Sequence, residues 1–79
     1  MPVYYFHIRS DGAVIEDEDG LELADLDRAT FEAIAGARDI VVDRALSGEP
    51  IGLNDVFEIT GESGDVLLTV PFRDAVPEN

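Results

Sequence analysis

The stretch from Ala24 to Gly48 is the only segment of this chain that is long and periodic enough to form a full helix. Asp25 is a good N-cap, because its carboxylate can accept hydrogen bonds from the unpaired amides of the first turn. At the far end, Gly48 suits a left-handed cap and Pro50 prevents the helix from continuing. The sequence therefore predicts one long helix, with strands and turns on either side of it.

The predicted helix has one main apolar stripe, which should face the rest of the molecule. Steps of about 100° per residue gather its members on one side. They are Leu26, Ala29, Ala33, Ile34, Ala37, Ile40 and Val41. Because the stripe is rich in alanine, we expect the helix to lie close against the surface that it covers.

A second apolar set falls on a flank of the helix beside its polar side, and consists of Phe31, Ala35, Val42 and Leu46. One interpretation is a wide apolar arc that loops partly cover. The other is a contact between subunits, because Phe31 and Leu46 are unfavourable to leave in water. The sequence leaves both interpretations open.

The segments that flank the helix are typical of β-hairpins. In the first segment Tyr4, Phe6 and Ile8 alternate with residues of the opposite face, and turn signals follow at residues 10–12. The predicted strands are 3–9, 13–15, 56–60 and 66–72, with an extended segment at 21–23 and a loose tail at 74–79. The prediction is a single α+β domain over residues 1–79, with an antiparallel sheet of about four strands in ββ-α-ββ order and one long helix packed on one face.

A single helix covers only one face of such a sheet. The uncovered face should carry some of a set of apolar and aromatic residues, namely Val3, Tyr5, His7, Ile15, Val56 and Leu67. This face is therefore a candidate for a functional or subunit surface. At the end of the last strand, Pro71 lacks an amide donor, which suits a strand end or a sheet edge.

Length and composition restrict the means by which the domain is stabilised. A chain of 79 residues buries only about 60% of its unfolded surface, and small domains commonly add disulfides, a metal or oligomerisation. Cysteine is absent and histidine occurs once, which excludes disulfides and argues against a zinc site. We expect no metal and no cofactor, and we expect a homo-oligomer.

The charge is extreme, with 18 acidic residues against five arginines and no lysine, for a net charge of −13. Such a chain repels phosphate backbones and anionic membranes, so we expect neither nucleic acid nor membrane as a partner. A basic partner protein is compatible with the charge. The start of the chain has no signal-peptide pattern, which predicts a cytoplasmic location.

Two features invite a catalytic or metal-binding interpretation; the first is disfavoured and the second fails. His7 is a general-base candidate, but Ser10 and Ser63 lie in turns without a nucleophile setting, so a structural role is favoured. Aligning Gly20 with the turn glycine of a calcium loop puts Ile15 and Leu26 where carboxylates are required. We therefore assign no catalytic, cofactor-binding or metal-binding residue and predict a non-enzyme.

Several segments carry a family resemblance. Residues 1–9, 18–23, 57–59 and 66–72 resemble a bacterial family of short uncharacterised proteins, with a Tyr-Phe-His opening at residues 5–7 and a Val-Pro-Phe close at residues 70–72. The resemblance covers nearly the whole chain and implies one compact domain without an assigned activity. It also implies that Tyr5, Phe6 and His7 serve folding or binding.

The leading hypothesis from the sequence is a non-enzymatic protein-interaction module that acts as a homodimer. Its contact would be the uncovered sheet face, with Tyr5 and His7, or the helix flank, with Phe31, Val42 and Leu46. The rival hypothesis is a small-molecule binder or minor enzyme with a pocket lined by Tyr5 and His7.

Overall fold

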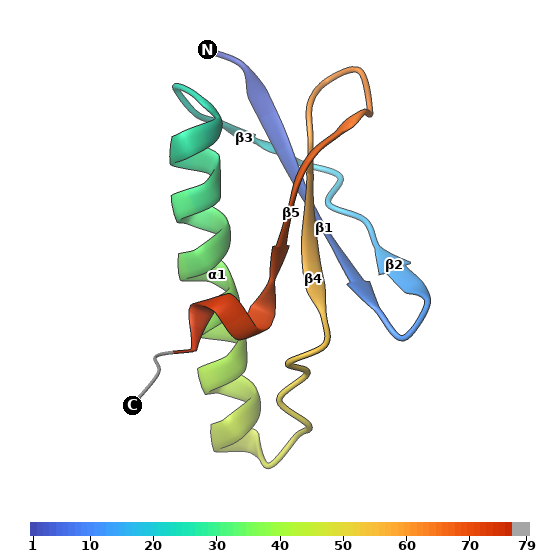
Figure 1. The fold of residues 1–79 in the computed structure, drawn as a ribbon, viewed down its shortest axis with the longest axis vertical. Coiled ribbons are helices and arrows are strands. Elements are labelled where there is room, and N and C mark those ends of the chain that lie inside the picture. Colours follow the sequence, from blue (N-terminus) through green and yellow to red (C-terminus); the bar gives the residue numbers. More distant parts are fainter. Residues whose placement is uncertain (77–79) are drawn as a thin grey trace.

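The computed structural model, which describes residues 1–76, has two layers, a long helix against one face of an antiparallel sheet (Figure 1). The α+β class with one helix packed on the sheet is therefore confirmed. The elements in chain order are β1 (Val3–Ser10), β2 (Ala13–Ile15), β3 (Leu21–Glu22), α1 (Leu26–Ser47), β4 (Val56–Thr60), β5 (Val66–Pro71) and a 3₁₀ helix, η1 (Phe72–Ala75).

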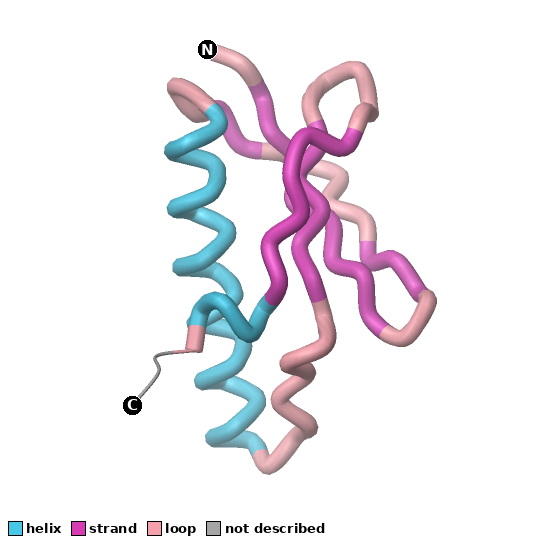
Figure 2. Tube along the Cα trace, in the orientation of Figure 1, coloured by secondary structure: helices cyan, strands magenta, loops and turns pink. Residues whose placement is uncertain are grey.

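Strand β1 is the centre of the sheet. The strand order is β2-β1-β4-β5, and β3 pairs with β1 as a fifth short strand. On one side, the end of β1 near Ser10 pairs with β2 and the end near Val3 pairs with β3. On the other side β1 pairs with β4, which pairs with β5, and all pairs are antiparallel. A long loop returns from the end of α1 to β4 (Figure 2).

Both predicted caps of the helix are present. The Asp25 carboxylate accepts from the Arg28 amide at 2.9 Å, and Gly48 has a left-handed backbone with φ of 76°. The predicted apolar stripe faces the sheet, because Ala29, Ala33 and Ala37 are fully buried and the larger stripe residues pack at its margins. The small alanine side chains let α1 approach the sheet closely, as the sequence predicted.

The core lies between α1 and the sheet and is built around Phe57. The Phe57 ring lies 5.0 Å from the ring of Phe72 and 6.2 Å from that of Phe6, between centroids. Phe72 begins η1, which packs on α1, and Arg38 Nε donates to the Ala75 carbonyl at 3.2 Å. Residues 74 and 75, expected in a loose tail, thus belong to η1, and Ala75 is buried. Residues 77–79 of that expected tail lie outside the described part.

Two strand residues, Ile15 and Val66, lie on other faces than simple alternation predicted. Ile15 pairs with Ile8, whose side chain points toward the helix, so Ile15 shares that side of the sheet. On β5 the register shifts, so that Thr60 pairs with Val66 while Ile59 pairs with Leu68. Val66 therefore lies on the uncovered face with Thr60, whereas simple alternation had placed it with Leu68 on the helix side.

Replacing Gly36 with alanine should raise the free energy of unfolding by about 0.5–1 kcal/mol, the usual difference between these residues inside a helix. The added Cβ would lie 3.8 Å from the Phe57 ring, an ordinary contact. The midpoint of urea unfolding measures the change. The control is Gly20→Ala, which should destabilise, because its Cβ would lie 2.7 Å from Val3 and Gly20 has a φ of 69°. A lower midpoint for Gly36→Ala would contradict this packing.

Candidate functional site

The helix flank predicted from the sequence is exposed on the outward side of α1. Phe31, Val42 and Leu46 are 59%, 49% and 83% exposed, and Ala35 lies among them. We call these four residues the outer stripe. The guanidinium of Arg28 lies 4.8 Å from the Phe31 ring centroid. Three large apolar side chains of one helix therefore remain in contact with solvent.

The uncovered sheet face is less open than the sequence suggested. The rings of Tyr5 and His7 are half-buried and stack in parallel, with centroids 6.3 Å apart. The loop between β2 and β3 crosses this face, and a Cβ on Gly20 would come within 2.8 Å of the Tyr5 ring. Glycine is required there both by the close approach and by the positive φ.

Both ring nitrogens of His7 are bonded within the protein. Its Nδ1 accepts from the backbone amide of Asp17 at 3.0 Å, and its Nε2 lies 3.1 Å from the Thr60 hydroxyl. Because a backbone amide can only donate, Nδ1 is the bare nitrogen, and Nε2 carries the hydrogen and donates to Thr60. His7 thus ties the loop to β1 and β4, and proton transfer at either nitrogen would require one of these bonds to break.

Asp17 is the residue of this region that the sequence did not single out. Its Oδ2 accepts from the Phe6 amide at 3.1 Å, and its Oδ1 accepts from the amides of Asp19 and Gly20 at 3.1 and 3.2 Å. The Phe6 amide lies between the parts of β1 that pair with β2 and with β3. The carboxylate therefore fills a gap in the sheet edge.

The carboxyl group of Asp17 is tuned by opposing effects. Partial burial acts to raise its pKa, but the hydrogen bonds from the amides of Phe6, Gly20 and Asp19, with the nearby His7, outweigh burial and hold the pKa below its ordinary value. An Asp followed three residues later by a Gly is a turn signal, which indicates the bonds to the amides of Asp19 and Gly20 but not the contact with Phe6.

A polar hollow of about 590 Å³ lies elsewhere, between the β1–β2 turn and the loop after α1. Its lining includes Ser10, Asp11, Arg44 and Asp55. Arg44 Nη1 donates to the Ile51 carbonyl at 3.1 Å and to the Asp55 carboxylate at 3.0 Å. The guanidinium is therefore held by this internal pair, and neither Tyr5 nor His7 lines the hollow.

Within residues 1–76, no helix combines the length and the apolar character needed to cross a membrane. The same part of the chain holds no cluster of three or more His, Asp or Glu side chains arranged to hold a metal ion.

A family model described as Domain of unknown function (DUF6894) matches residues 3–73. The chain belongs to this family. The match runs from the first residue of β1 into η1, so the DUF6894 unit comprises the helix and all five strands. No curated protein and no solved structure matches the chain. Membership of DUF6894 confirms the coarser part of the resemblance, an uncharacterised family that covers nearly the whole chain.

Proposed function

We propose that this protein is a non-enzymatic interaction module that works as a homodimer through the outer stripe of α1. The observation that carries the proposal is the exposure of Phe31, Val42 and Leu46 along one side of one helix. Large exposed apolar side chains gathered on one side of a helix are typical of a protein interface.

The spacing of the outer stripe suits a second copy of the same chain. A two-fold interface uses the same patch on both subunits, and two α1 helices meet antiparallel when the axis is perpendicular to them. Phe31 and Leu46 are equally distant in sequence from a point midway between residues 38 and 39, and so are Ala35 and Val42. Phe31 of one copy then meets Leu46 of the other, and the small Ala35 meets Val42.

Charge also favours the helix as the contact. Two copies with a net charge of −13 each repel one another, so a contact should avoid acidic groups. Helix α1 carries four acidic residues against three arginines, whereas the rest of the chain carries fourteen against two. A dimer through α1 therefore brings together a segment with a net charge of only −1 in each chain.

The other surfaces give less support. The uncovered sheet face carries the Arg9–Glu58 ion pair, at 2.9 Å, and the crossing loop with Asp17, and burying such polar groups is unfavourable. A catalytic role for His7 has the least support, because both of its ring nitrogens are already bonded.

Replacing Phe31 and Leu46 with glutamate in one variant should give a folded monomer, with dimer affinity lowered about 100-fold or more, because each contact between these two large apolar residues would become a contact between two like charges. Light scattering measures the mass and circular dichroism the fold. The matched control is Val14→Glu with Ile51→Glu, which adds the same two charges at exposed apolar positions outside the outer stripe and should leave the dimer intact. A dimer that survives the Phe31 and Leu46 changes would exclude the outer stripe as the contact.

A further inference from the structure

We propose that the outer edge of β5 binds an extended segment of a basic partner protein, which adds to the sheet as a further strand. Strand β5 ends the strand order, and no strand within residues 1–76 pairs with its outer side. Val66, Leu67 and Leu68 are 55%, 46% and 36% exposed, and Thr69 is exposed as well. This site goes beyond the proposed homodimer, because it uses a different surface and a different partner.

The strand pairings identify the backbone groups that point outward. In an antiparallel strand, the amide and carbonyl of one residue point to the same side, and the side alternates along the chain. The Phe6 amide donates to Asp17, away from β4. Ile59 of β4 pairs with Phe6, so the backbone amide and carbonyl of Ile59 point away from β1, toward β5. The β5 partner of Ile59 is Leu68, whose backbone amide and carbonyl therefore point to β4. Thr69, the next residue, points its amide and carbonyl outward.

The available edge is short, which favours a defined segment over open-ended pairing. The register shift beside Val66 interrupts β5 at one end. Pro71, two residues after Thr69 and on the same outward side, has no amide to donate. Bulges and prolines are the usual means of limiting pairing at a sheet edge. The segment that fits is therefore a few residues long and centred on Thr69.

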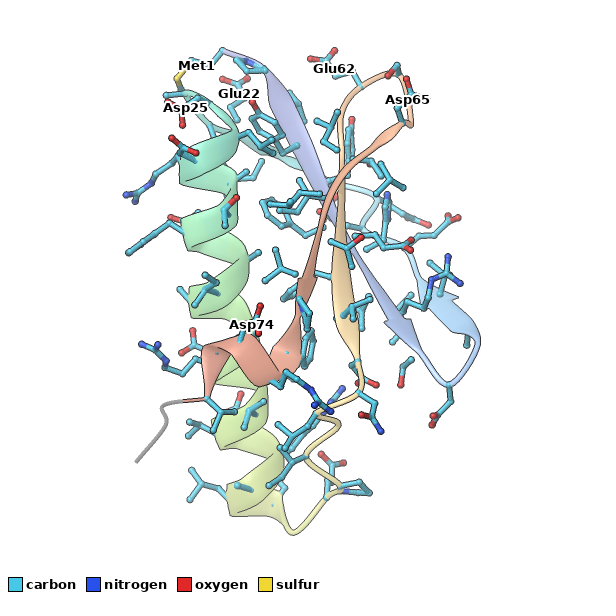
Figure 3. The ribbon with its side chains drawn as sticks, in the orientation of Figure 1. Met1, Glu22, Asp25, Glu62, Asp65 and Asp74 are labelled. Carbon is cyan, nitrogen blue, oxygen red and sulfur yellow. The ribbon has the colours of Figure 1, made fainter. Side chains whose placement is uncertain are left out.

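The charges around β5 indicate the chemistry of the partner. The strand itself is uncharged, and Asp65 lies in the turn before it, where Glu62 instead accepts from the Val3 amide of β1 at 3.3 Å (Figure 3). After the strand, η1 carries Asp74 beside Arg73, whose guanidinium donates to Asn54 at 2.9 Å. A complementary segment has a β-branched centre for the strand contact and lysine or arginine at both ends. A second copy would instead bring another chain with a net charge of −13 to this edge. A basic partner therefore fits this edge better than a second copy does.

The test is a titration of the isotope-labelled full chain with the synthetic peptide KKVTVTVKK, followed by amide chemical shifts. We expect the shifts to centre on residues 66–71 and the affinity to fall as salt is added. Thr69→Pro removes the outward amide while Leu68 and Val70 still pair with β4, and it should weaken binding at least tenfold. The matched control, Thr69→Ala, keeps the amide and should bind within about twofold of the wild type.

A charge exchange tests the partner class without a proline in the strand. Asp65→Lys combined with Asp74→Lys should weaken KKVTVTVKK at least tenfold and permit binding of EEVTVTVEE. Equal binding by Thr69→Pro and Thr69→Ala, shifts centred away from β5, or no binding at millimolar peptide would overturn the proposal. Concentration-dependent shifts at β5 without peptide would overturn it in favour of self-pairing. Shifts in the outer stripe of α1 report separately on the homodimer.

Discussion

Replacing Asp55 with alanine is expected to lower the free energy of unfolding by about 3 kcal/mol, the lower end of the range for breaking a buried ion pair. The Asp55 side chain is 7% exposed and pairs with Arg44, which is 23% exposed and so keeps some contact with water. Without Asp55, the guanidinium of Arg44 stays beside the Phe72 ring, at 5.7 Å, and loses its ionic partner. Domains of this size have a total stability of about 4–12 kcal/mol, so the loss is a large part of it.

Urea unfolding measures this loss, and the chain offers a matched control. Glu32→Ala breaks the exposed Arg28–Glu32 pair within α1 and should cost about 0.5 kcal/mol. Arg44→Met combined with Asp55→Ala should cost less than the sum of the two single changes, because both remove the same interaction. An Asp55→Ala variant as stable as Glu32→Ala would contradict the proposed role of this pair.

Replacing Asp17 with asparagine is expected to lower the free energy of unfolding by about 1–3 kcal/mol. Three backbone amides donate to the two carboxylate oxygens, and an amide side chain offers only one oxygen, so at least one donor would face an NH₂ group. The matched control is Asp19→Asn, the same charge change at an exposed side chain that accepts no hydrogen bond within residues 1–76. Thermal or urea unfolding should show little effect for the control.

The contribution of Asp17 to the free energy of unfolding should decrease as the pH is lowered. Burial acts to raise its pKa, but the backbone hydrogen bonds prevail and the folded pKa lies below the ordinary value. Such a group stabilises the fold above its unfolded pKa of about 3.9, and the contribution is lost as the pH falls through the folded pKa. The stability difference between wild type and Asp17→Asn should stay constant from about pH 7 to 5 and narrow below about pH 4. A difference unchanged at about pH 2 would contradict the role of the ionised carboxylate.

The parts of the fold that depend on local chemistry could be predicted from the sequence. The ends of α1 follow from Asp25 and Gly48, and its buried side follows from the spacing of small and apolar residues. The sheet face predicted for Ile15 was wrong. Strand β2 is only three residues long, and the face of each of its residues is set by the register with β1. Alternation within so short a strand does not determine that register.

The candidate surfaces were predictable to different extents. The outer stripe follows from helical periodicity alone, because Phe31, Val42 and Leu46 fall outside the buried side of α1. The role of Asp17 was hidden, because an acidic run is usually solvated and its contact with Phe6 exists only where β2 ends and β3 begins. The edge position of β5 depends on strand order, for which Pro71 was the only local indication.

The central claim is that the protein is a homodimer through α1, and sedimentation equilibrium of the wild type tests it most directly. The measurement should run from micromolar to millimolar chain concentration at about 0.15 M sodium chloride, where repulsion between the acidic chains is screened beyond about 8 Å. The mass should rise with concentration from that of one chain, 8.6 kDa, to that of two chains. A mass that stays at 8.6 kDa at the highest concentration would contradict the claim.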